Sequence, residues 1–109
     1  MNALPLSWPL NGRRVVLIGA GAWLVRKVAL LSRTPAELVV FTPEEPTRIE
    51  ATAVVHVRWP DVAELSDAAL IVVAFEDRVL AEQGAALART ARAPLNVVDY
   101  PDLSDFHFP

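Results

Sequence analysis

Five short runs of apolar, mostly β-branched residues recur along this chain of 109 residues, and helical or turn-rich segments separate them. Continuous apolar runs of this kind are typical of strands that are buried on both faces of a sheet. Strands that alternate with helices predict a parallel sheet covered by helices on both faces. The five predicted strands are Arg14–Ile18, Glu37–Phe41, Val54–Arg58, Leu70–Ala74 and Leu95–Val98.

The segments between these runs predict the connections of the sheet. Helical spacing covers Trp23–Ser32, and a pattern rich in Ala and Leu covers Arg78–Thr90, with Asp77 as its N-cap. A weaker helical pattern covers Thr47–Ala53. Because crossovers between parallel strands are right-handed, we expect an α/β fold with a Rossmann-like doubly wound sheet of about five strands, in the order 3-2-1-4-5. Residues 1–109 then form a single domain.

This topology predicts where a ligand binds. In open parallel sheets, ligands lie beyond the carboxyl ends of the strands, near the point where the strand order reverses. Four segments of the chain are expected to meet around one crevice at that edge. They are Gly19–Trp23, Thr42–Glu44, Ala74–Asp77 and Asp99.

The glycine turn Gly19-Ala20-Gly21 stands between a predicted strand and a helix, which is where a dinucleotide phosphate binds. The third position of the usual pattern needs a small residue, and here it is Leu24, beside the bulky Trp23. The acidic residue that would hold a ribose is also displaced, since Thr42 and Pro43 follow the second strand and Glu44 comes after them. Dinucleotide binding and a plain tight turn are therefore both open interpretations.

Asp99 follows the last predicted strand, where a carboxylate could exchange a proton with a bound substrate. The alternative is a turn or capping aspartate. His56 lies inside the third predicted strand, where a packing role is expected. His107 stands in an aromatic tail, where an interface or packing role is expected ahead of a functional one. Two distant histidines without suitably spaced carboxylates predict no metal site.

The composition excludes several classes of function. The net charge is −3 and the ten basic residues are scattered, which argues against nucleic acid and anionic membranes as partners. The absence of cysteine excludes disulfides, thiolate chemistry and cysteine-based zinc sites. No apolar stretch is long enough for a transmembrane helix and no signal peptide is recognisable, so we expect a cytoplasmic protein.

Several segments resemble the N-terminal NAD-binding domain of siroheme synthase, the precorrin-2 dehydrogenase/sirohydrochlorin ferrochelatase family. The opening LPLSWPLNGRRVVLIGAG is similar to the family's start, and Arg26-Lys27 matches a basic pair in its first helix. Val40–Glu44 is similar to the end of its second strand. Asn96–Asp99, Pro101 and Phe106–Pro109 follow its N-V-x-D-x-P and F-x-x-P segments, so the similarity runs along essentially the whole chain.

The resemblance implies an NAD-dependent oxidoreductase of siroheme, and hence porphyrin, biosynthesis that oxidises precorrin-2 to sirohydrochlorin. It places Asp99 at the family's catalytic aspartate, which in bifunctional members is also implicated in inserting ferrous iron. The substrate would be a tetrapyrrole that carries many carboxylates. The implied cofactor-binding residues are Gly19, Ala20, Gly21, Ala22, Trp23, Pro43, Glu44, Ala74 and Phe75.

The chain also departs from the family pattern. Trp23 and Leu24 replace smaller residues, and Phe75-Glu76 stands where the family has Thr-Asp. The chain ends where family members enter a second region that supplies the dimer interface and part of the tetrapyrrole site. A homodimer or a separate partner chain could complete the site. Three hypotheses follow: a dehydrogenase domain, a non-catalytic relative acting as an interaction or tetrapyrrole-binding module, and a nucleotide-binding domain with another ligand.

Overall fold

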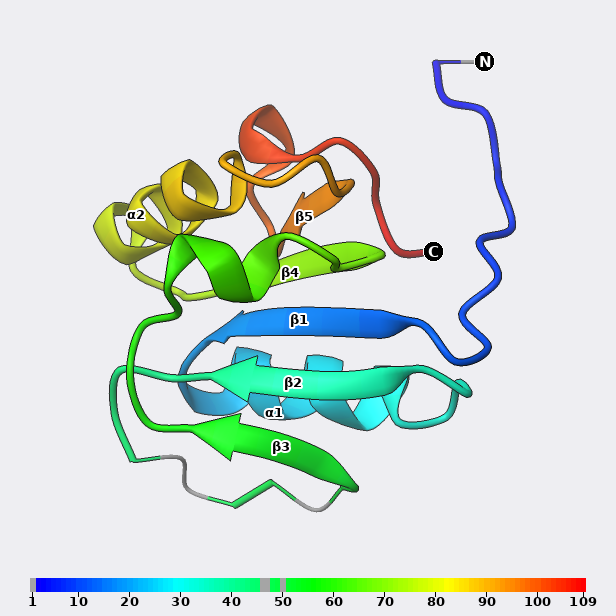
Figure 1. Ribbon diagram of the computed structural model, residues 1–109. Coiled ribbons are helices and arrows are strands. Elements are labelled where there is room, and N and C mark those ends of the chain that lie inside the picture. Colours follow the sequence, from blue (N-terminus) through cyan, green and yellow to red (C-terminus); the bar gives the residue numbers. More distant parts are fainter. Residues whose placement is uncertain (1, 46–47, 50) are drawn as a thin grey trace.

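The computed structural model describes residues 2–45, 48–49 and 51–109, and its centre is one sheet of five parallel strands (Figure 1). The strand order is β3-β2-β1-β4-β5, which confirms the predicted doubly wound arrangement. Four predicted strands agree with the structure to within one residue. The strands are β1 (Arg14–Gly19), β2 (Glu37–Phe41), β3 (Ala53–His56), β4 (Leu70–Ala74) and β5 (Leu95–Val97).

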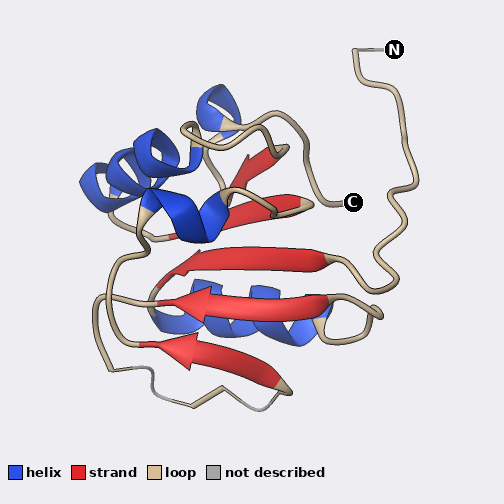
Figure 2. Cartoon of the chain, in the orientation of Figure 1, coloured by secondary structure: helices blue, strands red, loops and turns tan. Residues whose placement is uncertain are grey.

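A single helix covers one face of this sheet, and a helix together with a short 3₁₀ turn covers the other (Figure 2). Helix α1 (Gly21–Leu31) packs on one face through Leu24, Val28 and Leu31. Helix α2 (Arg78–Ala88) and the short 3₁₀ turn η1 (Val62–Leu65) pack on the other face. Since successive residues of a strand point to opposite faces, the strands contribute alternate side chains to the two halves of the core.

The small residues of α2 let it approach the sheet closely. Ala81, Ala85 and Ala88 are buried against β4 and β5. A Cβ atom at Gly84 would lie 2.7 Å from Cγ1 of Val73, so a larger residue does not fit there without a shift. Asp77 caps this helix as predicted, because its carboxylate accepts a hydrogen bond from the Leu80 N–H at 3.0 Å.

The connection from β2 to β3 differs from the expectation of a weak helix. Thr47 and Glu50 lie outside the described residues, and the described residues between the two strands form no helix. Strand β3 also ends at His56 rather than at Arg58. His56 pairs with Phe41, the last residue of β2, so the residues beyond it have no ladder partner.

The last residues of the chain run back along β5. A second 3₁₀ turn, η2 (Pro101–Leu103), reverses the chain, and Asp105 then bonds to both backbone groups of Leu95. Phe106 and Phe108 pack against the part of the core that α1 covers. No helix among the described residues is long and apolar enough to span a membrane.

Candidate functional site

The strand register brings the predicted site segments to one edge of the sheet. Gly19 is level with Ala74, and Ile18 is level with Phe41 on one side and Val73 on the other. Val73 in turn pairs with Val97 of β5. The glycine turn, the end of β2, the end of β4 and the residues after β5 therefore lie along the carboxyl edge, as the topology predicted.

The two glycines of the turn are required for different reasons. A Cβ atom at Gly19 would lie 2.3 Å from the carbonyl oxygen of Ala74, so only glycine allows β1 and β4 to approach here. Gly21 has a φ of +69°, a conformation that residues with side chains rarely adopt. The space where its Cβ would stand is empty to 4 Å, which leaves the backbone accessible to a ligand.

Helix α1 begins at this open backbone. Its N-cap, Ala20, makes no side-chain capping bond, and the first turn contains no acidic residue. The Ala20 N–H donates to the Ala74 carbonyl at 3.1 Å, which ties the turn to β4. The first N–H groups of a helix have no partner within the helix, so those of Gly21–Trp23 form a site suited to an anion such as a phosphate.

The two bulky residues after the turn have separate environments. Leu24 is 1% exposed and belongs to the core between α1 and the sheet, so its side chain does not enter the crevice. Trp23 is half-buried and packs against the edge of the same core. Ala22 is exposed. The residue at the third position of the glycine pattern therefore contributes to stability and does not block the turn.

The end of β2 is held in place by Thr42. Its buried hydroxyl donates a hydrogen bond to the Glu44 carbonyl at 2.9 Å, which fixes the turn that contains Pro43. Pro43 and Glu44 are exposed beyond the strand. They are accessible to a cofactor at this edge.

At the end of β4, a ligand can reach backbone atoms rather than side chains. Ala74 is fully buried. Phe75 is 2% exposed, and its ring lies 5.4 Å from that of Trp59 in the part of the core that α2 covers. The side chain of Phe75 therefore points away from solvent, and only its backbone could contact a cofactor.

Asp99 has an unusual backbone conformation directly after β5. Its φ is +61°, and it is the one residue other than glycine with a positive φ among those described. The turn is fixed on both sides, because Val98 N–H donates to Val73 and Tyr100 N–H donates to Val97. The Asp99 side chain is exposed, and no hydrogen bond or ion pair of the described residues engages its carboxylate. Such conformations cluster at functional sites.

A cavity of about 330 Å³ lies next to Asp99. It joins residues from β5 and the turn after it, from α1 and from the end of the chain. The lining residues are Lys27, Asn96, Val97, Val98, Asp99, Tyr100, Pro101, His107 and Phe108. The sequence patterns assign neither Lys27 nor His107 to a site. Both residues belong to segments that resemble the family, the basic pair of the first helix and the aromatic ending, and this resemblance is the signal that points to them.

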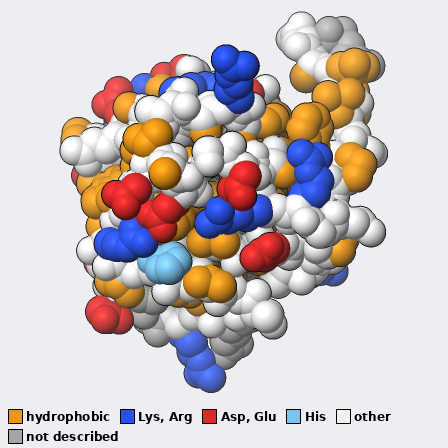
Figure 3. Space-filling model, in the orientation of Figure 1, with side chains coloured by type: hydrophobic (Ala, Val, Ile, Leu, Met, Phe, Trp, Pro, Cys, Tyr) orange, Lys and Arg blue, Asp and Glu red, His pale blue; other side chains and the backbone are white. Residues whose placement is uncertain are grey.

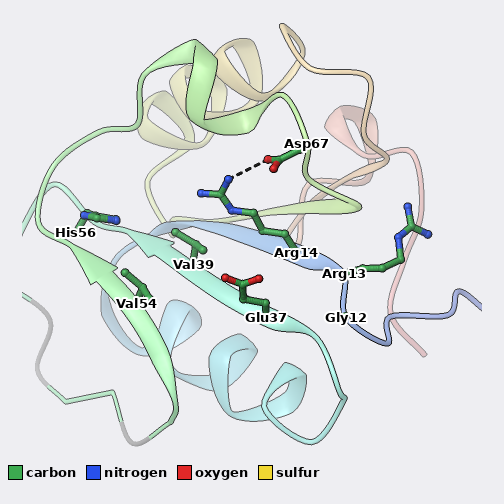
Figure 4. Close-up of a pocket in the computed structure, with 8 residues that line it drawn as sticks. All are labelled: Gly12, Arg13, Arg14, Glu37, Val39, Val54, His56 and Asp67. Carbon is green, nitrogen blue, oxygen red and sulfur yellow. Dashed lines mark hydrogen bonds and ion pairs between the residues drawn. The ribbon is translucent and has the colours of Figure 1, made fainter.

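A second cavity, of about 580 Å³, lies on the sheet face that Figures 3 and 4 show and extends from the amino ends of β1 and β2 to His56 at the end of β3. His56 and Val54 of β3 line one side of it, and Arg14 and Asp67 form an ion pair of 2.9 Å on the other (Figure 4). The His56 ring stacks on Phe41 at 5.0 Å, in agreement with the predicted packing role. Among the described residues, no three His, Asp or Glu side chains are close enough to hold a metal ion.

Comparison with known proteins gives three results. A family model described as "Putative NAD(P)-binding" matches residues 6–109. Curated relatives with the name siroheme synthase match the whole chain at 38% identity over 112 residues in Tolumonas auensis, 34% over 115 in Psychrobacter cryohalolentis and 35% over 117 in Methylobacillus flagellatus. The chain spans 24%, 22% and 24% of the length of these three relatives.

The solved structure of SirC, precorrin-2 dehydrogenase, has the same fold. The TM-score is 0.78 at 18% sequence identity, and the match covers 98% of this chain and 55% of the other.

Proposed function

The chain belongs to the NAD(P)-binding family that matches residues 6–109, and from this membership we propose that it is a precorrin-2 dehydrogenase-type domain of siroheme biosynthesis. In this proposal it binds NAD at the glycine turn and oxidises precorrin-2 to sirohydrochlorin. The observation that supports it most directly is the presence of two features on one sheet edge. These are the open backbone at Gly21 and, beside a cavity, the carboxylate of Asp99, which has no hydrogen-bond or ion-pair partner among the described residues.

The residues around the turn fit a dinucleotide. The uncapped start of α1 directs the N–H groups of Gly21, Ala22 and Trp23 toward the position of a pyrophosphate. Pro43 and Glu44 lie exposed at the neighbouring strand end, where a ribose would lie. The backbone of Ala74 and Phe75 lies at the end of β4, on the other side of β1 from Pro43 and Glu44. Bound NAD supplies a hydride acceptor.

We propose that Asp99 acts as the proton acceptor in this reaction. The oxidation removes one hydride and one proton from the substrate, and the carboxylate of Asp99 accepts the proton. Its exposure leaves its lone pairs available, and the fixed turn around it restricts where the carboxylate can point.

Calorimetric titration with NAD tests the cofactor site. A dissociation constant from micromolar to below millimolar, or about −5 to −8 kcal/mol, is expected for the unchanged chain. Gly21→Val should weaken binding by at least about tenfold, because the new side chain fills the open space and the φ of +69° disfavours any side chain.

The chain offers a matched control for this variant. Gly12 also has a positive φ, +66°, and open space around it, but it precedes β1 at the opposite edge of the sheet. Gly12→Val and Gly21→Val should therefore cost similar stability, about 1–2 kcal/mol each, while only Gly21→Val affects NAD. Equal NAD affinity in the two variants would exclude the glycine turn as the cofactor site.

The bulk of Trp23 directly after the glycine turn favours a second candidate function. In this alternative the chain is a tetrapyrrole-binding or interaction module without turnover. Tetrapyrrole binding with no heat from NAD or NADP would favour this alternative over the dehydrogenase.

The proposal has further parts. Residues 1–109 act as one cofactor-binding domain, and residues outside it, whether of the same protein, a second copy or a separate chain, complete the substrate site. The absence of cysteine supports a cytoplasmic location. Insertion of ferrous iron, the second activity of the bifunctional family members, is not part of the proposal.

A further inference from the structure

Lys27 differs from four of the arginines of this chain, because no ion pair among the described residues engages its ammonium group. It is the one lysine among ten basic residues. Arg14, Arg58, Arg78 and Arg89 each form an ion pair with a carboxylate at 2.6–2.9 Å. The Lys27 ammonium lies instead over the ring of Phe108, 4.5 Å from its centroid, and lines the cavity beside Asp99.

The Phe108 ring orients this lysine. A cation over an aromatic face is attracted to it but keeps its N–H groups available for other acceptors. Phe108 packs in turn against the core under α1, and the neighbouring backbone is tied to β5 by the hydrogen bond from Asn96 to the Phe106 carbonyl at 2.9 Å. The ammonium is therefore held at one side of the cavity by a fixed part of the chain.

The two charged side chains that line the cavity have opposite effects on an anionic ligand. Lys27 and Asp99 both line it, yet no ion pair joins them in the described part of the chain. A ligand carboxylate would be attracted to Lys27 and repelled by Asp99. A volume of about 330 Å³ is at the small end of ligand sites, so it suits one substituted ring of a larger molecule.

We propose that Lys27 binds a carboxylate side chain of the substrate and positions the attached ring against Asp99. This inference deepens the proposed function and rests on it, since it takes the substrate to be a polycarboxylate tetrapyrrole. Lys27 is the anchor for the anionic end, Phe108 contacts the ring, and Asp99 faces the reacting part. Lys27 is thus a binding and positioning residue, without a share in the proton transfer.

The single lysine makes the contact directly observable. Reductive methylation with ¹³C-formaldehyde keeps the positive charge and gives one dimethyllysine signal in the NMR spectrum, besides that of the N-terminal amine. The Lys27→Arg variant identifies the lysine signal by its loss. We expect uroporphyrin I, a tetrapyrrole with eight carboxylates, to shift the Lys27 signal in a saturable way and to leave the N-terminal signal in place.

Affinity for uroporphyrin I, measured by its fluorescence without NAD, separates Lys27 from general charge effects. Lys27→Ala should weaken binding by about tenfold or more, as expected for the loss of a charge-assisted hydrogen bond. Lys27→Arg should stay within about threefold of the unchanged chain, because it keeps the charge. Arg26→Ala is the matched control, since Arg26 is exposed on the same helix and does not line the cavity.

Three outcomes would overturn the inference: no binding of uroporphyrin I, binding that leaves the Lys27 signal in place, or equal losses in Lys27→Ala and Arg26→Ala. Circular dichroism of each variant confirms that it is folded. The NAD titrations of Gly21→Val and Gly12→Val are independent of this test. A chain that binds uroporphyrin I through Lys27 but gives no heat with NAD would keep the inference about Lys27 and reject the dehydrogenase.

Discussion

At the scale of single residues, the glycine turn shows how one motif serves two purposes. Gly19 is needed for packing, since a Cβ atom there would collide with the Ala74 carbonyl. Gly21 is needed for its positive φ and opens the backbone at the start of α1. The sequence alone does not distinguish these roles, because both positions appear only as glycine between a strand and a helix.

Asp99 has a similar double character. Asp and Asn are among the few residues that tolerate a positive φ, so the position suits a turn aspartate as well as a catalytic one. Its carboxylate, which no described residue engages, and the adjacent cavity favour the catalytic role.

Asp99→Asn separates the two roles. Asn accepts the same backbone conformation, so the free energy of unfolding should change by no more than about 0.5 kcal/mol. Formation of NADH from precorrin-2, followed by its absorbance, should fall by at least about a hundredfold because the amide cannot take the proton. Turnover that persists in this variant would make Asp99 a turn residue only.

At the scale of elements, helix α1 joins the cofactor edge to the core. Leu24, Val28 and Leu31 recur on one face of the helix and bury it against the sheet. Its first turn carries the candidate phosphate site, and its second turn carries Lys27. The packing of this helix therefore sets the position of both.

Leu24→Ala tests whether the residue at the third position of the glycine pattern obstructs the site or stabilises the fold. We expect the free energy of unfolding in urea to fall by about 2–5 kcal/mol, as for other buried leucines, with no gain in NAD affinity. Leu30, 40% exposed on the same helix, is the control, and its change to alanine should alter stability by about 0.5 kcal/mol or less. Tighter NAD binding in Leu24→Ala would contradict this interpretation.

The last residues of the chain act as a substitute for a sixth strand. The Leu95 N–H donates to the Asp105 carboxylate at 3.0 Å, and the Val97 N–H donates to the Ser104 hydroxyl at 2.8 Å. Side chains thus satisfy backbone groups that would otherwise form an open sheet edge. A hydrogen bond from Arg89 lowers the pKa of Asp105, which helps keep the carboxylate charged for this role.

At the scale of the whole molecule, ion pairs join segments that lie far apart in the sequence. Arg78 bonds to Asp102 and Arg89 to Asp105, which fixes the chain end to α2. Arg58 beyond β3 bonds to Glu64 of η1 at 2.7 Å. That hydrogen bond is the largest cause of a lowered pKa of Glu64, and a hydrogen bond from the Asp61 N–H is the next largest. The pKa falls from 4.5 to about 2.

Acid should weaken this connection. Because the pKa of Glu64 is lower in the folded chain, its contribution to stability is present above about pH 4.5 and is lost as the pH falls toward 2. Glu64→Gln should therefore lower the melting temperature at pH 7, with the difference shrinking between pH 4.5 and 2. A difference that does not depend on pH would show that the charge of Glu64 contributes nothing. Glu76→Gln, at an exposed position between β4 and α2, controls for general charge effects.

The order of the strands, the two helices and the convergence on one edge followed from the sequence alone. Continuous apolar runs such as Leu70–Ala74 can be recognised in the local sequence, because the strands of a parallel sheet are buried on both faces. Right-handed crossovers then leave few ways to connect the strands. The resemblance to a family likewise depends on local residues, such as the turn at Gly19 and the segment Asn96–Asp99.

The tertiary structure decided where the side chains point. Leu24 and Phe75 are large residues in a glycine-turn pattern and at a strand end, and only packing shows that both are buried away from the crevice. Lys27 and Phe108 are separated by most of the chain, so their contact depends on how the last residues fold back along β5. Sequence patterns determine local conformation and burial periodicity, whereas a binding site depends on distances between residues that only the folded chain brings together.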